Sequence, residues 1–276
     1  MAPGNPKILS LDPGRSAPRV IDEVVAALSR GELVVIPTET VYGVAADPRV
    51  PGAVERIYLA KSRSARKPIT LMAADVSQVR DRGVDVPPAA ARLAARYWPG
   101  PLTLVLKEGR KSGVAEIRPP MEEMEGRALR DRKHVASREL RPPEGKMEGR
   151  APARPEACGV AGASPSTVED GLLEGRAPRD RFIGFRVPDH PVTQAVLRAA
   201  GSLLAVTSAN RSGDDAAVTA QDAAAALGDR VSLILDAGRS PGGVASTVVK
   251  VDGEQVEVLR EGAIPKMEIL KVAGVA

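Results

Sequence analysis

Residues 33–36, Leu-Val-Val-Ile, form a short and wholly apolar run that is followed at once by Pro37. A β-branched run without alternating polar residues is typical of a strand covered on both faces, as in the sheets of α/β proteins. Because Pro37 has no amide proton to continue the ladder, the strand is predicted to end there. The polar residues that follow therefore lie at the end of a buried strand, where α/β folds bind ligands.

Around this strand, the chain alternates between helical and extended patterns. Apolar residues recur at helical spacing in five segments, and short apolar runs typical of strands lie between them. The last two runs are joined by the tight turn Asp252-Gly253 and must be antiparallel, so we expect an α/β fold with a mixed sheet flanked by helices. The predicted helices are 18–31, 51–60, 88–97, 190–200 and 219–227, and the further strands are 69–72, 102–106, 183–187, 203–207, 231–235, 244–251 and 256–259.

Composition excludes several classes of protein. A net charge of +4 is too balanced for a chain coated in nucleic acid, although a local basic groove is compatible with it. The single Cys158 excludes an intrachain disulfide, and only two histidines accompany it, so no structural zinc site is expected. No apolar run reaches about 18 residues and no secretory h-region is present, so we expect a cytoplasmic protein without a membrane partner.

Residues 111–181 differ from the rest of the chain. They contain no aromatic residue and 8 of the 24 prolines, and a Glu-Gly-Arg-Ala repeat recurs in them at irregular spacing. Such a segment buries too little apolar surface to offset its ordering entropy, so we expect a disordered insertion. The predicted organisation is a flexible N-terminus (1–15), one domain (16–264) interrupted by this insertion, and a C-terminal tail (265–276).

A basic cluster follows the second predicted helix. Lys61, Arg63, Arg66 and Lys67 lie within seven residues and have no acidic residue among them. They are compatible with a solvated helix end, where the dipole favours cations, and with a site for phosphate groups. The chain has neither a GxxxxGK[ST] loop nor a GxGxxG fingerprint, so a bound nucleotide would be held by side chains.

Further polar clusters follow other predicted strands. The segment 208–213, Ser-Ala-Asn-Arg-Ser-Gly, suits an ordinary turn as well as a site. Ser246 and Thr247 are compatible with a simple strand, and Arg186 and Arg260 with surface positions. Each cluster alone is a weak signal.

Taken together and in order, the motifs resemble the YrdC-like family of threonylcarbamoyl-AMP synthases. The resemblance covers about residues 20–110 and 182–264, and seven motifs in one order make it specific. The motifs are Pro-Thr-Glu-Thr-Val-Tyr-Gly (37–43), Lys61-x-Arg63, residues 97–103, Gly-Phe-Arg-Val-Pro (184–188), Ser-Ala-Asn-x-Ser-Gly (208–213), residues 246–249 and Leu259-Arg260-x-Gly262.

The resemblance implies a YrdC/RibB-like twisted mixed sheet with an open basic cleft. It also implies a nucleotidyltransferase that converts L-threonine, bicarbonate and ATP into threonylcarbamoyl-AMP and pyrophosphate. This is the first step toward threonylcarbamoyladenosine beside the anticodon of tRNA. Mg²⁺ would arrive with ATP, without a protein metal site. The partners would be the downstream tRNA-modifying machinery, with tRNA itself as a further candidate.

By motif position, the resemblance assigns Lys61 and Arg63 to catalysis. It also assigns the two ends of the cleft. Thr40, Arg186, Ser208 and Ser246 would bind threonine and its carbamate, and Lys61, Arg63, Lys67, Asn210 and Arg260 would bind ATP. Met72 stands where some members have a histidine, which removes one polar contact to threonine.

Two other functions remain open at this point. The first is a YrdC-like RNA-binding or ribosome-maturation protein, which should show a strong basic excess around the groove. The second is a carbamoyl-transfer module of hydrogenase maturation, which would be fused to acylphosphatase and zinc-finger segments.

Overall fold

The computed structural model describes residues 5–11, 18–64, 67–109 and 181–275. They fall in one unit, which comprises residues 1–125 and 180–276. The insertion expected at 111–181 lies outside the described residues except for Arg181, which pairs with Glu108 beside it in space.

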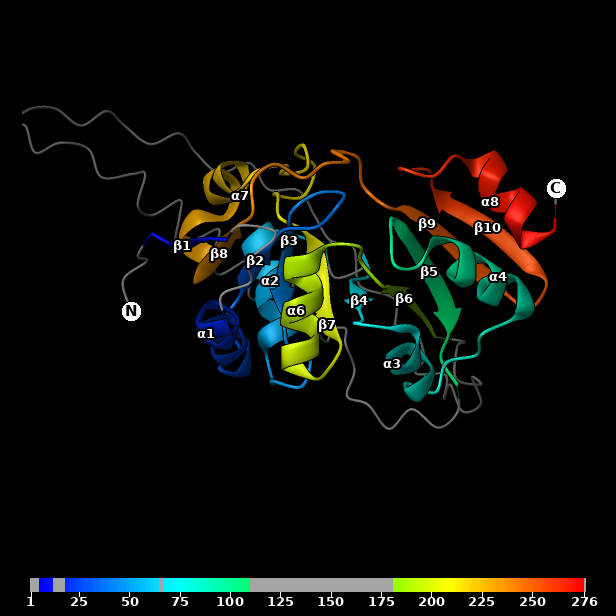
Figure 1. Ribbon diagram of the computed structural model, residues 1–276, viewed down its shortest axis with the longest axis horizontal. Helices are drawn as coiled ribbons and strands as arrows, with labels where there is room; N and C mark the ends of the chain where they lie inside the picture. The colour runs from blue at the N-terminus through cyan, green and yellow to red at the C-terminus, as the bar shows by residue number, and fades with distance from the viewer. Residues whose placement is uncertain (1–4, 12–17, 65–66, 110–180, 276) are drawn as a thin grey trace, which may run out of the picture. The chain divides into compact units, whose positions relative to one another are not determined.

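The strands form one ten-stranded sheet in the order β1-β8-β2-β3-β7-β4-β6-β5-β9-β10 (Figure 1). Strands β2 and β3 therefore lie beside β8 and β7, which come from the second half of the chain. The strands are β1 (Lys7–Ser10), β2 (Val34–Ile36), β3 (Gly43–Ala46), β4 (Thr70–Met72), β5 (Leu102–Lys107), β6 (Phe182–Arg186), β7 (Leu204–Ser208), β8 (Leu233–Asp236), β9 (Thr247–Asp252) and β10 (Gln255–Arg260).

The sheet is mixed. Strand β2 runs parallel to β8 and antiparallel to β3. Strand β9 runs parallel to β5 and antiparallel to β10, and these last two strands are the pair predicted across the turn at Asp252 and Gly253. The mixed sheet that the sequence predicts is confirmed.

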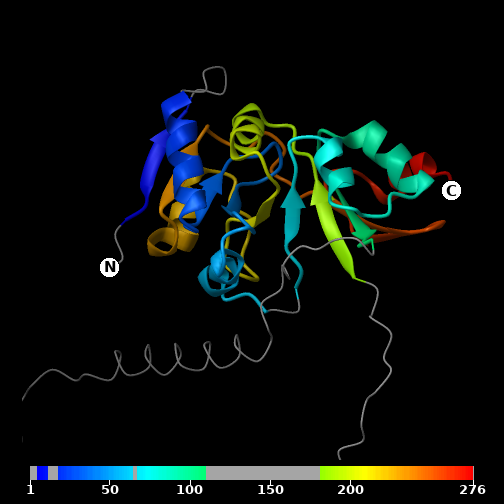
Figure 2. The ribbon, with the colours of Figure 1, turned by 90° about the horizontal axis from the view of Figure 1, so that it is seen from below.

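Helices cover both faces of the sheet. In Figure 2, α1 and α6 lie on one side of the strands around β2, and α2 and α7 lie on the other. The helices are α1 (Pro18–Ser29), α2 (Ala53–Lys61), α3 (Val76–Asp81), α4 (Pro88–Tyr97), α6 (Pro191–Ala200), α7 (Ala220–Leu227) and α8 (Lys266–Ala273), with a 3₁₀ turn at Gly228–Arg230.

The two covered faces explain why β2 has no polar residue. Val34 and Ile36 pack into the cluster that includes α1 and α6. Val35 points the other way, into the larger cluster that includes α2, α4 and α7. All three side chains are fully buried. Because successive side chains of a strand alternate between faces, a strand buried on both faces must be apolar throughout.

Two parts of the predicted boundaries need correction. Residues 7–10, expected to be flexible, form β1, which pairs in parallel with Leu233–Asp236. Residues 266–273, expected to be a tail, form α8, whose Ile269 and Ala273 are buried in the larger core cluster. Both elements are stabilised by partners far away in the sequence, which local composition does not reveal. Strand β3 and helix α3 were also missed, because both are short.

Among the described residues, the structure contains no helix with the length and apolar character needed to cross a bilayer.

Candidate functional site

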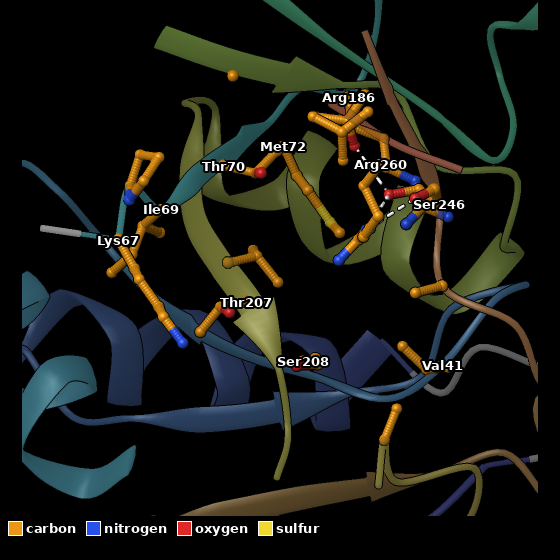
Figure 3. Close-up of a pocket in the computed structure, with 18 of the residues that line it drawn as sticks. Val41, Lys67, Ile69, Thr70, Met72, Arg186, Thr207, Ser208, Ser246 and Arg260 are labelled. Carbon is orange, nitrogen blue, oxygen red and sulfur yellow. Dashed lines mark hydrogen bonds between the residues drawn. The ribbon is translucent and has the colours of Figure 1, made fainter. Parts of the chain in front are cut away.

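A cavity of about 730 Å³ opens beside the central strands of the sheet. Its walls come from strands β3, β4, β5, β6, β7, β9 and β10 and from the loops next to them. Figure 3 shows Lys67 on one side of the cavity, with Arg186, Arg260 and Ser246 across from it. The predicted site residues that line the cavity are Arg63, Lys67, Arg186, Ser208, Asn210, Ser246 and Arg260.

The charge of the cavity wall is predominantly positive. Four of the lining side chains are Lys or Arg, and Asp214 is the one acidic side chain among the described lining residues. Such a surface suits an anionic ligand, since guanidinium groups bind carboxylates and phosphates through two parallel hydrogen bonds.

The turn after β2 is organised by the hydroxyl of Thr38. Its oxygen accepts hydrogen bonds from the amides of Thr40 and Val41, both at 3.2 Å, and its proton is donated to the carbonyl of Val41 at 2.7 Å. Thr40, predicted to bind substrate, is 1% exposed and is not part of the cavity wall. It is connected to the cavity through Arg186, which donates to its hydroxyl at 2.9 Å.

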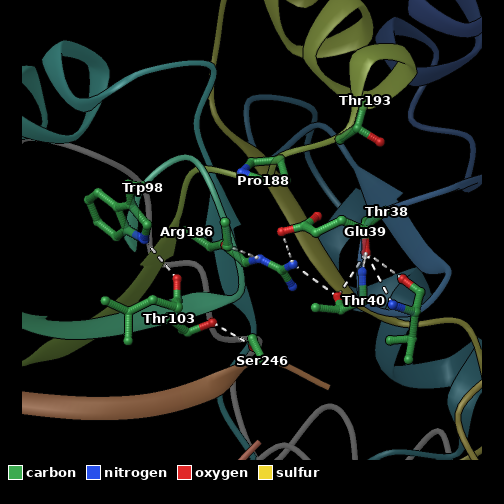
Figure 4. Close-up of polar contacts among 12 residues, drawn as sticks. Thr38, Glu39, Thr40, Trp98, Thr103, Arg186, Pro188, Thr193 and Ser246 are labelled. Carbon is green, nitrogen blue, oxygen red and sulfur yellow. Dashed lines mark hydrogen bonds and ion pairs between the residues drawn. The ribbon is translucent and has the colours of Figure 1, made fainter. Parts of the chain in front are cut away.

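Arg186 ends β6 and is held on two sides (Figure 4). Its Nη2 donates to Glu39 Oε1 at 2.7 Å as well as to Thr40, and its Nε donates to the carbonyl of Gly100 at 3.2 Å. The side chain is 5% exposed. The guanidinium is therefore fixed before any ligand enters.

Ser246 and Arg260 come together at the same end of the cavity. Arg260 Nη2 donates to the carbonyl of Ser246 at 2.7 Å and to its hydroxyl at 3.3 Å. The hydroxyl of Ser246 also lies 2.9 Å from that of Thr103 on β5 (Figure 4). Burial lowers the pKa of Arg260, and the nearby positive charge of Arg186 lowers it further.

Lys61 does not line the cavity. Its residue is 1% exposed, and its ammonium donates to the carbonyls of Ser208 and Asn210 and, at 3.3 Å, to Asn210 Oδ1. Burial lowers the pKa of Lys61 to about 8, and the positive charge of Arg63 contributes to the shift. In this structure Lys61 joins the end of α2 to the loop that carries two predicted site residues.

Arg63 and Lys67 form the side of the cavity nearest α2. Arg63 Nη2 donates to the carbonyl of Pro68 at 2.8 Å, which holds the loop that precedes β4. Lys67 lines the cavity and is exposed. Arg66 of the predicted basic cluster lies outside the described residues.

Ser208 and Asn210 are positioned by the central strands. Strand β7 ends at Ser208, which pairs with Gly43 of β3. The side-chain amide of Asn210 donates to the carbonyls of Arg211, at 2.9 Å, and Asp214, at 2.7 Å. The segment 208–213 is thus a turn and also part of the cavity wall.

Three side chains of this site were given no role by sequence reasoning, although Glu39 and Thr103 lie within the motifs 37–43 and 97–103. Thr103 is 2% exposed and holds Ser246, Glu39 holds Arg186, and Asp214 lines the cavity. The available signal for Thr103 was one hydroxyl residue inside the apolar run 102–106. Met72, expected to affect threonine binding, is in the wall.

The part of the chain that the structure describes contains no group of three His, Cys, Asp or Glu side chains able to hold a metal ion.

Comparison with known proteins identifies the family. The family model named Sua5/YciO/YrdC, with the description "telomere recombination", matches residues 26–126 and 164–262. The chain belongs to the Sua5/YciO/YrdC family. The matched ranges contain all the predicted site residues.

Two relatives within the Sua5/YciO/YrdC family carry the same activity in their names. Threonylcarbamoyl-AMP synthase of Bacillus subtilis is 31% identical over 92% of this chain, and a putative threonylcarbamoyl-AMP synthase of Mycobacterium tuberculosis is 29% identical over 93%. The chain spans 56% of the length of the Bacillus protein and 90% of the Mycobacterium protein.

Solved structures of the family have the same fold. P. abyssi Sua5 complexed with L-threonine is 26% identical, with a TM-score of 0.68 over 97% of this chain and 61% of its own. E. coli YciO, at 22% identity, has a TM-score of 0.63 over 93% of this chain and 96% of its own.

Proposed function

We propose that this chain is an L-threonylcarbamoyladenylate synthase, a nucleotidyltransferase that joins L-threonine, bicarbonate and ATP and releases pyrophosphate. The observation that carries the proposal is the cavity in which four basic side chains meet the hydroxyl and amide groups of Thr103, Ser208, Asn210 and Ser246, which come from three separate motifs. The names of the relatives and the threonine complex of P. abyssi Sua5 support the choice of substrate.

The reaction needs positioning and charge neutralisation more than a protein nucleophile. The amine of threonine attacks CO₂ or bicarbonate, and an oxygen of the resulting carbamate attacks the α-phosphate of ATP and expels pyrophosphate. Negative charge develops on the phosphate oxygens during the second step. Fixed guanidinium and ammonium groups aimed at those oxygens stabilise that charge.

We assign threonine to the end of the cavity at Arg186, Ser208 and Ser246. Thr40 contributes indirectly, through the hydrogen bond that its hydroxyl accepts from Arg186. The guanidinium of Arg186 is already oriented by its three protein acceptors, so it can bind the carboxylate without reorganising. Hydroxyl groups of serine suit the amine and hydroxyl of the substrate.

We assign the ATP phosphates to Arg63, Lys67, Asn210 and Arg260. Arg260 lies at the boundary between the two ends, because it donates to Ser246 of the threonine end and its charge also acts on Arg63. Mg²⁺ would be carried by the triphosphate, because Asp214 is the one carboxylate among the described residues of the wall. When bound, Mg²⁺ neutralises phosphate charge. A direct phosphate contact by Lys61 would require its ammonium to leave at least one carbonyl of Ser208 or Asn210.

The product would serve the machinery that transfers the threonylcarbamoyl group to tRNA, so we place the enzyme in the cytoplasm. The proposed reaction does not require direct binding of tRNA, so we propose tRNA only as a secondary partner of this enzyme.

The deciding experiment is pyrophosphate release with threonine, bicarbonate and ATP, each omitted in turn. We expect release only when all three are present. Arg186→Ala should abolish it, whereas Arg198→Ala, a matched change on the exposed side of α6, should leave it unchanged. Release that is independent of threonine would contradict the assignment. Tight RNA binding without turnover would favour an RNA-binding protein instead.

A further inference from the structure

Glu39 is a largely buried carboxylate next to the cavity but outside its wall. Its Oε1 accepts the 2.7 Å hydrogen bond from Arg186, and its side chain is 15% exposed. Its second oxygen, Oε2, is buried and has no hydrogen-bond partner in the described structure. A carboxylate in this position is costly unless its charge is balanced, and Arg186 is the group that balances it.

The backbone of Glu39 is fixed from two directions. The hydroxyl of Thr38 organises the turn that contains it, and the amide of Gly242 donates to the carbonyl of Glu39 at 2.9 Å. A Cβ atom at Gly242 would lie 2.7 Å from that carbonyl oxygen, so only glycine allows this approach. The carboxylate therefore has a rigid support.

Glu39 also determines the charge at this end of the cavity. Arg186 and Arg260 both line it, and Figure 3 shows them side by side. With Glu39 bound to Arg186, the three side chains carry one net positive charge. Without Glu39, Arg186 and Arg260 would carry two positive charges. The two guanidinium groups would then repel each other, because no carboxylate would neutralise Arg186.

We propose that Glu39 is a positioning and specificity residue, which orients Arg186 and sets this end of the cavity to accept a monoanionic carboxylate in preference to a phosphate dianion. The inference rests on the proposed function, since the carboxylate is taken to be that of the amino-acid substrate. The contacts recorded for Arg186 within the described residues use Nε and Nη2, which leaves Nη1 for the ligand. The one net positive charge of Glu39, Arg186 and Arg260 matches the one negative charge of the ligand's carboxylate.

The test compares the wild-type protein with Glu39→Gln, which keeps the shape of the side chain and a hydrogen-bond acceptor but removes the charge. Binding of L-threonine and of inorganic phosphate is measured separately by isothermal titration calorimetry. We expect the Kd for threonine to rise about tenfold, as for loss of a charge-assisted hydrogen bond, and the Kd for phosphate to fall. In the pyrophosphate assay, KM for threonine should rise while KM for ATP changes much less.

Two further variants make the test specific. Glu32→Gln removes a carboxylate from an ion pair with Arg30 away from the cavity, and it should change neither Kd. Glu39→Asp keeps the charge but shortens the side chain, so it should weaken threonine binding without strengthening phosphate binding. If Glu39→Gln does not fold, this Asp variant alone carries the comparison.

The outcomes separate the two proposals. Threonine binding that depends on Glu39 in a protein that releases no pyrophosphate would contradict the proposed function and support the role of Glu39. If the Kd for threonine and the Kd for phosphate are each the same in the wild-type, Gln and Asp proteins, the role of Glu39 is overturned, whatever the turnover. A wild-type protein that does not bind threonine would overturn both.

Discussion

Lys61 keeps its ammonium group buried, and this burial predicts an unusual dependence of stability on pH. The group donates to two backbone carbonyls and to the side chain of Asn210 in a residue that is 1% exposed. Burial lowers its pKa to about 8, from an ordinary value of 10.5. Between these two values the unfolded chain binds more protons at this position than the folded protein does. The stability contributed by this linkage therefore rises with pH above about 8 and is lost as pH falls through that value.

The magnitude follows from the two pKa values. Between pH 7 and pH 9 the linkage adds about 1 kcal/mol to the free energy of unfolding of the wild-type protein. Lys61→Met removes the titrating group while keeping most of the aliphatic side chain. The difference in stability between the wild type and this variant should therefore widen by about 1 kcal/mol over that pH range. The variant should already be less stable at pH 7, because the carbonyls of Ser208 and Asn210 lose their donor.

Urea unfolding at pH 7, 8 and 9 measures this difference. With a slope of about 2–3 kcal/mol per molar urea, the expected change moves the midpoint by several tenths of a molar. Lys271→Met, on the exposed side of α8, removes the same charge elsewhere and is measured in parallel. A difference between wild type and Lys61→Met that stays constant from pH 7 to pH 9 would refute the reasoning.

Three further changes and one control variant test other parts of the structure. Arg63→Ala should reduce turnover more than tenfold and raise KM for ATP, with little change in Tm, because its guanidinium holds only the loop at Lys67 and Pro68; a normal KM for ATP would contradict its phosphate role. Tyr42→Phe removes the 2.6 Å hydrogen bond to the carbonyl of Gly238 and should cost about 1–2 kcal/mol, which calorimetry would detect as a fall in Tm of a few degrees. Gly262→Ala would place a Cβ atom 2.2 Å from the carbonyl oxygen of Ala245 and 2.6 Å from the carbonyl carbon of Ser246, so both Tm and threonine binding should fall. Gly253→Ala meets open space and should lose only stability, through its φ of 57°.

The sequence was most informative where one element buries residues in a regular pattern. The run 33–36 predicted β2, and the structure shows its side chains in two separate core clusters. The turn at Asp252 and Gly253 predicted the antiparallel pair of β9 and β10. Both predictions depend on neighbours along the chain, which composition and spacing report directly.

Sequence reasoning was least informative where the partner of a segment lies far away. Strand β1 has four residues in a stretch rich in proline and glycine, and it is ordered by a strand that begins at Leu233. Helix α8 is ordered by packing against α4, where Arg92 donates to the carbonyl of Ala273. No local pattern marks such partners, because the stabilising contacts form only when the chain has folded.

The functional residues divide in the same way. By itself, the sequence determined the chemical groups available and their order, from the Pro-Thr-Glu-Thr turn to Arg260, and with them the family. The tertiary structure alone decided that Arg186 faces the cavity while Glu39 supports it, and that the ammonium of Lys61 is buried on two carbonyls. The physical reason is that burial and charge pairing depend on which distant strands become neighbours. Those neighbours determine whether a charged side chain contacts a ligand or holds the protein group that does.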